Sequence, residues 1–193
     1  AQMRIICRSR LDAPMLRCQT LNMTEIRTVC VYCGSGPGTH PSFIESAKAL
    51  GKIFAENGVR LVYGGGSVGM MGAVAKSVLD HGGNVTGIIP DFLVKKEVMM
   101  PLKDLIITPD MPERKRLMFE HSDAFVALPG GVGTLEELVE QLPWKQLGRH
   151  QKPILLANIE GSIRLEPSRS MRRKLFNLHA SSRIRARFSR HNC

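Results

Sequence analysis

The segment Pro129–Glu137, with the sequence PGGVGTLEE, carries the strongest chemical signal in this chain. It follows an apolar run and opens a segment of helical character. Its glycines allow a tight turn and close approach to a ligand, and the free amides at a helix start favour a phosphate. Thr134 could cap those amides or donate to a phosphate oxygen. A plain strand-to-helix turn is the alternative, but it needs fewer glycines.

Glu137 lies about one turn into the helix that this segment opens. A carboxylate there would be close to a phosphate-bearing ligand without competing for the same amides. It also stands beside Glu136 and Glu140, and a run of acidic residues is usually a solvated helix face. The residues alone leave both interpretations open.

A second candidate site is the segment Met111–Arg116, with the sequence MPERKR, which opens another predicted helix. Arginine can bind a carboxylate or phosphate through two parallel hydrogen bonds, so Arg114 and Lys115 would suit anion recognition. Ordinary surface charge explains the same residues equally well. The spacing does not separate the two interpretations.

Two further glycine-rich turns, CGSG at 33–36 and YGGGSVGMMG at 63–72, also follow predicted strands. Each could admit a sugar or phosphate, or could simply allow tight helix packing. Cys30 and Cys33 have a CxxC spacing, but on an extended strand they point to opposite faces. No second Cys or His pair follows at zinc spacing, so we expect no metal site.

Alternating strands and helices would position these turns. Apolar runs predict the strands, and apolar residues at helical spacing, such as those from Phe43 to Phe54, predict the helices. The predicted strands are 28–33, 60–64, 84–90, 104–109, 123–130 and 152–158, and the predicted helices are 41–57, 69–81, 111–121 and 133–147. This order predicts an α/β fold, a single-domain, Rossmann-like, doubly wound parallel sheet. Ligands of such sheets bind at the carboxyl ends of the strands, where the glycine-rich turns fall.

Charge and cysteine content exclude several classes of protein. The 193 residues have a net charge of +10, of which residues 1–27 contribute +3 and 162–193 contribute +8. Dispersed arginines without aromatic residues between them give little support for a nucleic-acid partner. No apolar run is long enough to span a membrane. The five cysteines, an odd number without framework spacing, indicate reduced thiols and a cytoplasmic location.

The two ends also set the expected domain limits, because neither shows a sustained folding period. We predict a disordered or non-native extension over 1–25, a folded domain over 26–161, and a basic, disordered or out-of-frame tail over 162–193. The other interpretation of the basic ends is an arm that binds nucleic acid or an anionic membrane.

The four segments CGSG, YGGGSVGMMG, MPERK and PGGVGTLEE together resemble the Lonely Guy (LOG) family of cytokinin-activating phosphoribohydrolases, many of which are still labelled lysine decarboxylase-like. The resemblance covers residues 26–161, which would form a nucleotide-binding catalytic domain. It implies a homodimeric hydrolase that needs no cofactor or metal. Such an enzyme cleaves the N-glycosidic bond of a cytokinin riboside 5′-monophosphate, or of AMP, to free base and ribose 5-phosphate.

The same resemblance assigns roles to individual residues. Arg114 and Glu137 match the catalytic pair of the family. The expected substrate-binding residues are Ser35, Gly65, Gly66, Glu97, Lys115, Gly130, Gly131, Val132, Gly133, Thr134, Leu135 and Glu136, with Glu97 placed through a one-residue gap. Two departures stand out: Pro143 replaces a usual Thr or Ser, and the resemblance stops at Gly161, before the C-terminal helix of the family.

Cleavage of a glycosidic bond builds positive, oxocarbenium-like charge on the ribose. Glu137 could stabilise that charge and orient or deprotonate water, while Arg114 holds Glu137 or the ribose in place. The phosphate would act as a remote handle that positions the sugar. The alternative function is a catalytically impaired nucleotide-binding module from a truncated member of the family.

Overall fold

A computed structural model describes residues 25–96 and 98–162 of the chain. The predicted extension and tail fall outside these residues, apart from Glu25 and Ser162, and so does Glu97. The strands are β1 (Thr28–Tyr32), β2 (Arg60–Tyr63), β3 (Val85–Pro90), β4 (Asp104–Thr108), β5 (Ala124–Ala127) and β6 (Ile154–Leu156). The helices are α1 (Pro41–Glu56), α2 (Gly69–Asp80), α3 (Asp91–Val94), α4 (Met111–Glu120), α5 (Val132–Gln146) and the 3₁₀ helix η1 (Ile159–Gly161).

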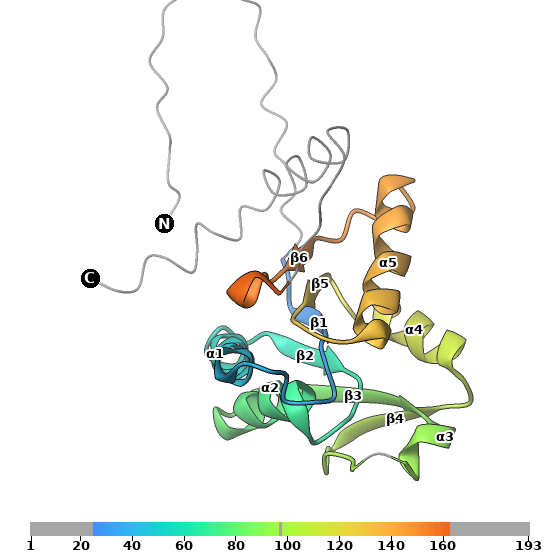
Figure 1. Cartoon of the computed structure of the whole chain (residues 1–193). Helices are drawn as coiled ribbons and strands as arrows, with labels where there is room; N and C mark the ends of the chain where they lie inside the picture. Colours follow the sequence, from blue (N-terminus) through green and yellow to red (C-terminus); the bar gives the residue numbers. More distant parts are fainter. Residues whose placement is uncertain (1–24, 97, 163–193) are drawn as a thin grey trace, which may run out of the picture.

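The six strands form one parallel sheet in the order β4-β3-β2-β1-β5-β6 (Figure 1). The chain builds outward from β1 to β4 and then returns to add β5 on the other side of β1. The strand order therefore reverses between β1 and β5, and ligands of doubly wound sheets bind at such a switch point. The predicted Rossmann-like architecture is confirmed.

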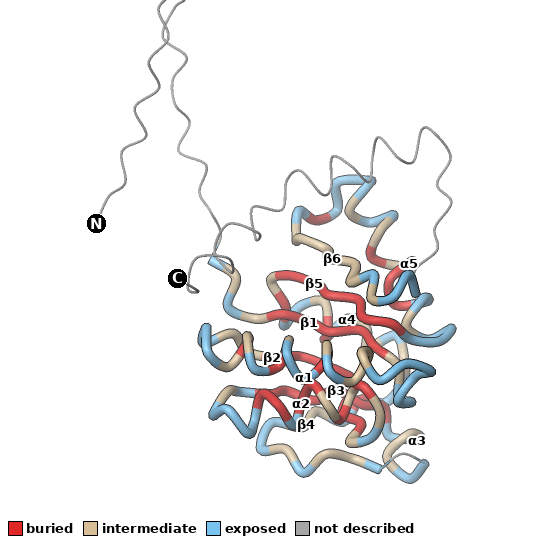
Figure 2. The backbone as a smooth tube through the Cα atoms, turned by 60° about the vertical axis from the view of Figure 1, so that its left-hand side comes forward, coloured by how far each residue is buried: buried red, intermediate tan, exposed pale blue. Residues whose placement is uncertain are grey.

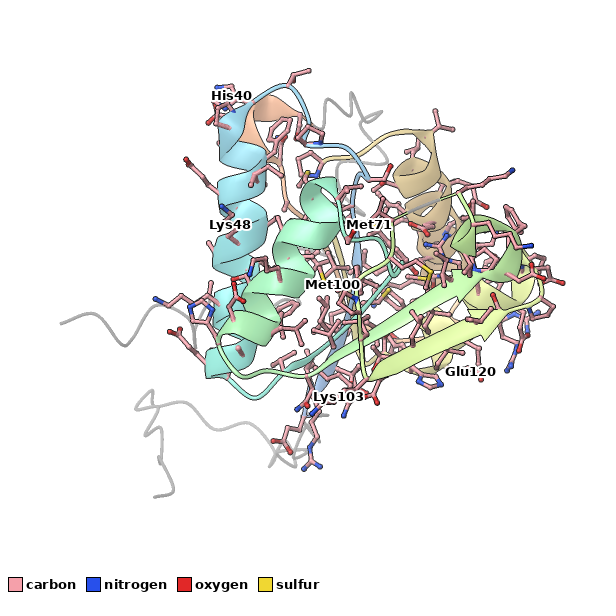
Figure 3. The ribbon with its side chains drawn as sticks, turned by 90° about the horizontal axis from the view of Figure 1, so that it is seen from below. His40, Lys48, Met71, Met100, Lys103 and Glu120 are labelled. Atoms are coloured by element: carbon pink, nitrogen blue, oxygen red, sulfur yellow. The ribbon has the colours of Figure 1, made fainter. Side chains whose placement is uncertain are left out.

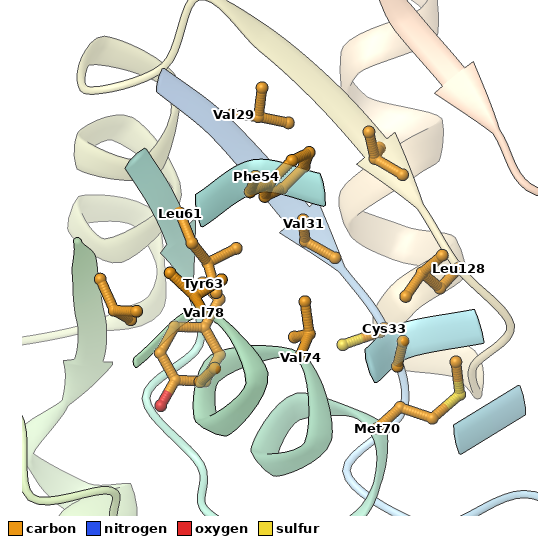
Figure 4. Packing of buried hydrophobic residues seen from close by; sticks show 14 of the residues in the cluster. Val29, Val31, Cys33, Phe54, Leu61, Tyr63, Met70, Val74, Val78 and Leu128 are labelled. Carbon is orange, nitrogen blue, oxygen red and sulfur yellow. The ribbon is translucent and has the colours of Figure 1, made fainter. Parts of the chain in front are cut away.

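Alternation along β1 assigns each side chain to one of two apolar layers. Val29, Val31 and Cys33 pack with buried residues of α1 and α2 on one face (Figure 4). Cys30 and Tyr32 pack with Met118 of α4 on the other. The expected separation of the two cysteines onto opposite faces is thus confirmed, and both thiols are free and buried.

Helices cover both faces of the sheet. Figure 3 shows Lys48 on α1 and Glu120 on α4 at opposite sides of the molecule. Trp144 of α5 meets Phe119 of α4 edge to face, with 5.8 Å between ring centroids, so α5 lies beside α4. The central strands are buried along their length, whereas β4 and β6 at the sheet edges are partly exposed (Figure 2). No helix in the described ranges is long and apolar enough to cross a membrane.

Sequence periodicity missed the structure of the segment between β3 and β4. No element was predicted between residues 90 and 104, but this segment contains α3, whose four residues are too few to display a helical repeat. It also contains an antiparallel bridge from Met99 to Gly66, which ties this segment to the turn after β2. The 3₁₀ helix η1 was not predicted either, and the remaining elements begin and end within a few residues of their predicted positions.

Gly51 allows α1 and α2 to pack closely. A Cβ atom at this position would lie 2.5 Å from the carbonyl oxygen of Val74 and 2.8 Å from Cβ of Ser77. Both neighbours belong to α2, and Ser77 also donates a hydrogen bond of 2.7 Å to the carbonyl of Lys48. A side chain at residue 51 must therefore push the two helices apart.

We predict that Gly51→Ala lowers the free energy of unfolding by about 1–3 kcal/mol, because overpacking outweighs the gain in helix propensity. Urea unfolding followed by circular dichroism measures this difference. Gly36→Ala is the matched control, since no atom lies within 4 Å of its added Cβ. Equal midpoints for the two variants would contradict this account of the interface.

Candidate active site

The glycine-rich turns after β1 and β5 meet at the switch point of the sheet. The amide of Gly34 donates a hydrogen bond of 3.1 Å to the carbonyl of Pro129. A Cβ on Gly34 would lie 3.3 Å from Cα of Gly130, and a Cβ on Gly130 would collide with the Thr134 side chain. Glycine at both positions therefore lets the two turns pack directly against each other.

The N-terminus of α5 presents free amides next to this contact. Its N-cap residue is Gly131, which has no side chain to satisfy them. The predicted capping role of Thr134 is wrong, because the helix begins two residues earlier, at Val132. The amide of Leu135 already donates to the carbonyl of Gly131 at 3.1 Å. An anion would thus meet the amides of residues 132–134, and not that of Leu135.

Arg114 of α4 and Glu137 of α5 form a buried ion pair. The distance from Nη1 of Arg114 to Oε1 of Glu137 is 3.5 Å, and both side chains are 10% exposed. Nε of Arg114 donates a hydrogen bond of 3.1 Å to the carbonyl of Ile88 in β3. This anchor fixes the guanidinium, and the burial of Glu137 excludes the interpretation of that residue as part of a solvated face.

The environment of Glu137 raises its pKa. Burial raises the pKa of this carboxyl above its ordinary value, because desolvation penalises the charge. The nearby Arg114 and Lys115 lower the pKa, and Glu136 and Glu140 raise it. Burial has the largest effect, so Glu137 is poised to exchange a proton at a higher pH than an exposed glutamate.

Lys115 bridges α4 and α5 beside the buried pair. Its Nζ lies 2.6 Å from Oε1 of Glu136 and 2.9 Å from Oε2 of Glu140. The hydrogen bonds to these carboxylates raise the pKa of Lys115, which keeps it charged. Arg116, in contrast, is exposed and pairs within its own helix, so the surface-charge interpretation of MPERKR applies to this residue.

The turn after β2 does not offer a second helix N-terminus. The amides of Met70 and Met71 donate to the carbonyls of Gly36 and Gly34, at 3.2 and 3.4 Å. A Cβ on Gly69 would overlap the backbone of this same loop. For the start of α2, the alternative of tight helix packing is therefore the correct one.

The other predicted substrate contacts that the structure describes differ in exposure. Ser35 is exposed in the loop that packs on α2, while Gly65 and Gly66 are buried. The carbonyl of Gly65 accepts from the amide of Met100 at 3.1 Å, so this turn is backed by the segment before β4. Val132 and Leu135 both expose their side chains. Val132 could therefore contact a phosphate only through its backbone amide, and Leu135, whose amide is already bonded, offers only an apolar side chain.

Two residues of the centre were missed at the level of sequence. A Cβ on Gly64 would collide with Nη2 of Arg114, so this glycine makes room for the guanidinium. Glu140 pairs with Lys115, although sequence analysis noted it only as part of an acidic run. The available signal was its spacing of four residues from Glu136, which places both on one helix face.

A scan against protein-family models matches residues 71–179 to a family described as "Possible lysine decarboxylase". The match runs past Gly161, so the expectation that the resemblance stops there is wrong. A solved structure of the molybdenum cofactor carrier protein from Chlamydomonas reinhardtii is 26% identical. It superposes with a TM-score of 0.56, covering 81% of this chain and 87% of the carrier.

Curated relatives extend the similarity over most of the described domain. The probable cytokinin riboside 5′-monophosphate phosphoribohydrolase LOG4 of Oryza sativa subsp. japonica is 51% identical over 137 residues, 70% of this chain. LOG3 of Arabidopsis thaliana, named as a phosphoribohydrolase of the same substrate, is 44% identical over 144 residues, 74% of this chain. The chain spans 60% of the length of the rice protein and 67% of the Arabidopsis protein. By the family match and by these identities, the chain belongs to the LOG family, whose model is described as "Possible lysine decarboxylase".

Proposed function

We propose that this protein is an N-glycosidase that cleaves cytokinin riboside 5′-monophosphates, and AMP, to free base and ribose 5-phosphate. One observation carries the proposal: the buried pair of Arg114 and Glu137 lies one helical turn from the free amides at the start of α5. The names of the relatives support the same reaction. Arg114 and Glu137 are the proposed catalytic residues.

The reaction follows from the chemistry of these groups. The 5′-phosphate binds the amides of residues 132–134 and holds the ribose over Glu137. As the glycosidic bond breaks, the carboxylate stabilises the positive charge that develops on the sugar. Glu137 then orients and deprotonates the attacking water, and its raised pKa suits it to accept that proton. The water oxygen bonds to C1′ of the ribose, and the base leaves with the electron pair of the broken C1′–N bond and takes a proton from solvent.

Arg114 keeps Glu137 in the reactive state. Without the guanidinium, burial would leave the carboxyl protonated and unable to act as a base. The hydrogen bond from Arg114 to the carbonyl of Ile88 holds the guanidinium against the sheet. Arg114 thus orients the carboxylate while the substrate is bound.

The fold alone does not separate a hydrolase from a binding module, since a protein named as a molybdenum cofactor carrier has a similar structure. The pair of Arg114 and Glu137 favours the hydrolase, because binding a phosphate requires no buried carboxylate. A catalytically impaired nucleotide-binding module remains the alternative function. It would bind AMP without releasing adenine.

The proposed assembly is a homodimer, and the proposed location is the cytoplasm. Val132, Leu135 and Val139 are 84%, 54% and 50% exposed along one side of α5. Such an apolar stripe is typical of a protein interface, and a second copy of the chain would cover it. The free thiols of Cys30 and Cys33 suit a reducing compartment.

The proposed reaction predicts base release from AMP and from isopentenyladenosine 5′-monophosphate, measured by chromatography. Adenosine and isopentenyladenosine should be cleaved with a kcat/KM lower by about 100-fold or more, because they lack the phosphate that positions the sugar. Binding of AMP without release of base would support the binding module instead. Equal cleavage of nucleotide and nucleoside would contradict the phosphate site.

Glu137→Gln should lower kcat roughly 100- to 10,000-fold while KM for AMP changes little, because it removes the base and keeps the shape. In the unmodified protein, kcat/KM should fall as pH drops through the raised pKa of Glu137. This loss occurs at a higher pH than the titration of an exposed glutamate, and the variant should not show it. Glu56→Gln, which removes an exposed carboxylate of α1, is the control. A fully active Glu137→Gln enzyme would remove this residue from the mechanism.

Val139→Glu should convert the dimer into a monomer in sedimentation velocity experiments, because it places a charge within the apolar stripe of α5. Leu79→Glu, at an exposed apolar position on α2, should leave the assembly unchanged. A monomer before substitution, or a dimer that tolerates Glu at residue 139, would contradict this interface.

A further inference from the structure

Helix α5, which carries Glu137, is held to the domain by little apolar packing. Its buried residues are Glu137, Leu138 and Gln141, two of which are polar. Its stripe of Val132, Leu135 and Val139 faces away from the domain. Because α5 buries few apolar side chains, polar contacts add to the ring contact of Trp144 with Phe119 in fixing how α5 sits beside α4.

Lys115 supplies the strongest of these contacts. Glu136 and Glu140 are one turn apart on α5 and flank the ammonium group, at 2.6 and 2.9 Å. The side chain of Glu140 is 28% exposed and that of Glu136 is 52% exposed. Lys115 donates a hydrogen bond to the more exposed Glu136, whereas the atom of Glu140 that it meets, Oε2, is buried. Water therefore screens the attraction between Lys115 and Glu140 less strongly.

The order of residues links this contact to the catalytic pair. Lys115 follows Arg114 on α4, and Glu136 precedes Glu137 on α5. The ion pairs Arg114–Glu137 and Lys115–Glu136 are therefore adjacent, and both join α4 to α5. Together they define the rotation of α5 about its axis, which decides whether Glu137 faces Arg114 or turns away.

We propose that Glu140 is a positioning residue that acts through Lys115 to hold α5 against α4, so that Glu137 stays opposite Arg114. The inference rests on the proposed function and adds a residue for which sequence reasoning gave no role. It also makes Lys115 a link between helices, where a direct substrate contact was expected. Lys115 has three N–H donors, so each carboxylate it binds leaves it fewer for a substrate.

Trp144 provides a measurement of this docking that does not depend on catalysis. It is the one tryptophan of the chain and lies on α5. Its ring meets Phe119 of α4 edge to face, with centroids 5.8 Å apart. Trp144 is 43% exposed in this position, and loosening of α5 from α4 would expose more of the indole, which acrylamide quenching of its fluorescence detects.

The test compares Glu140→Gln with the unmodified full chain. We expect kcat for AMP to fall about tenfold, with KM changed less than about threefold, because a small displacement of Glu137 affects turnover more than binding. Trp144 should become more accessible to acrylamide at a temperature where circular dichroism shows a folded protein. Lys115→Met should reproduce both effects. The double variant should be no worse than Lys115→Met alone, since removing Lys115 already breaks its contact with Glu140.

Glu120→Gln is the matched control. It removes a carboxylate from an ion pair of 2.6 Å with Arg116, but both partners lie on α4. Because Glu120 follows Phe119, this variant also reveals any local effect on the ring that contacts Trp144. Both kcat and quenching should match those of the unmodified protein.

Unchanged turnover and unchanged quenching in Glu140→Gln would overturn the proposal. A raised KM with unchanged kcat would overturn it as well, because Lys115 would then act as a substrate ligand that Glu140 merely orients. If the unmodified protein releases no base, the proposed function fails. In that case Trp144 quenching still decides whether Glu140 docks α5.

Discussion

A carboxylate buried to the extent of Glu137 must either be protonated or face a positive charge, because desolvation otherwise makes ionisation too costly. Arg114 supplies that charge at 3.5 Å. A buried ion pair rarely repays its desolvation in stability, so stability is a poor explanation for this one. The proposed chemistry gives the arrangement a purpose, since the pair keeps a carboxylate dry and still able to take a proton.

That pair can form because a parallel sheet brings distant connections to one edge. Arg114 follows β4 and Glu137 follows β5, while the guanidinium rests over Gly64, which follows β2. Gly64, Arg114 and Glu137 lie on three different connections of the sheet. They come together because each connection begins at the carboxyl end of its strand, on the same edge of the sheet. Glycine at residue 64 then gives the arginine room to reach across.

Sequence reasoning predicted the sheet and the start of α5 because both depend on local pattern. The apolar runs predict the strands. Three glycines around residue 131 indicate a turn that approaches a ligand or another segment closely. The contact between Lys115 and Glu140 could not be predicted, because it depends on the rotation of one helix against another. The same rotation decides that Glu137 is buried and that Glu136, its neighbour, is half exposed.

The position of Glu137 along α5 limits what can react there. A phosphate at the helix start and a carboxylate further along are like charges, and they must be separated or compensated. From Gly133 to Glu137 the helix rises about 6 Å. Arg114 neutralises the carboxylate, so a phosphate at the helix start would meet little repulsion from it. The substrate that we propose matches this spacing, because a single ribose joins its phosphate to the reacting carbon.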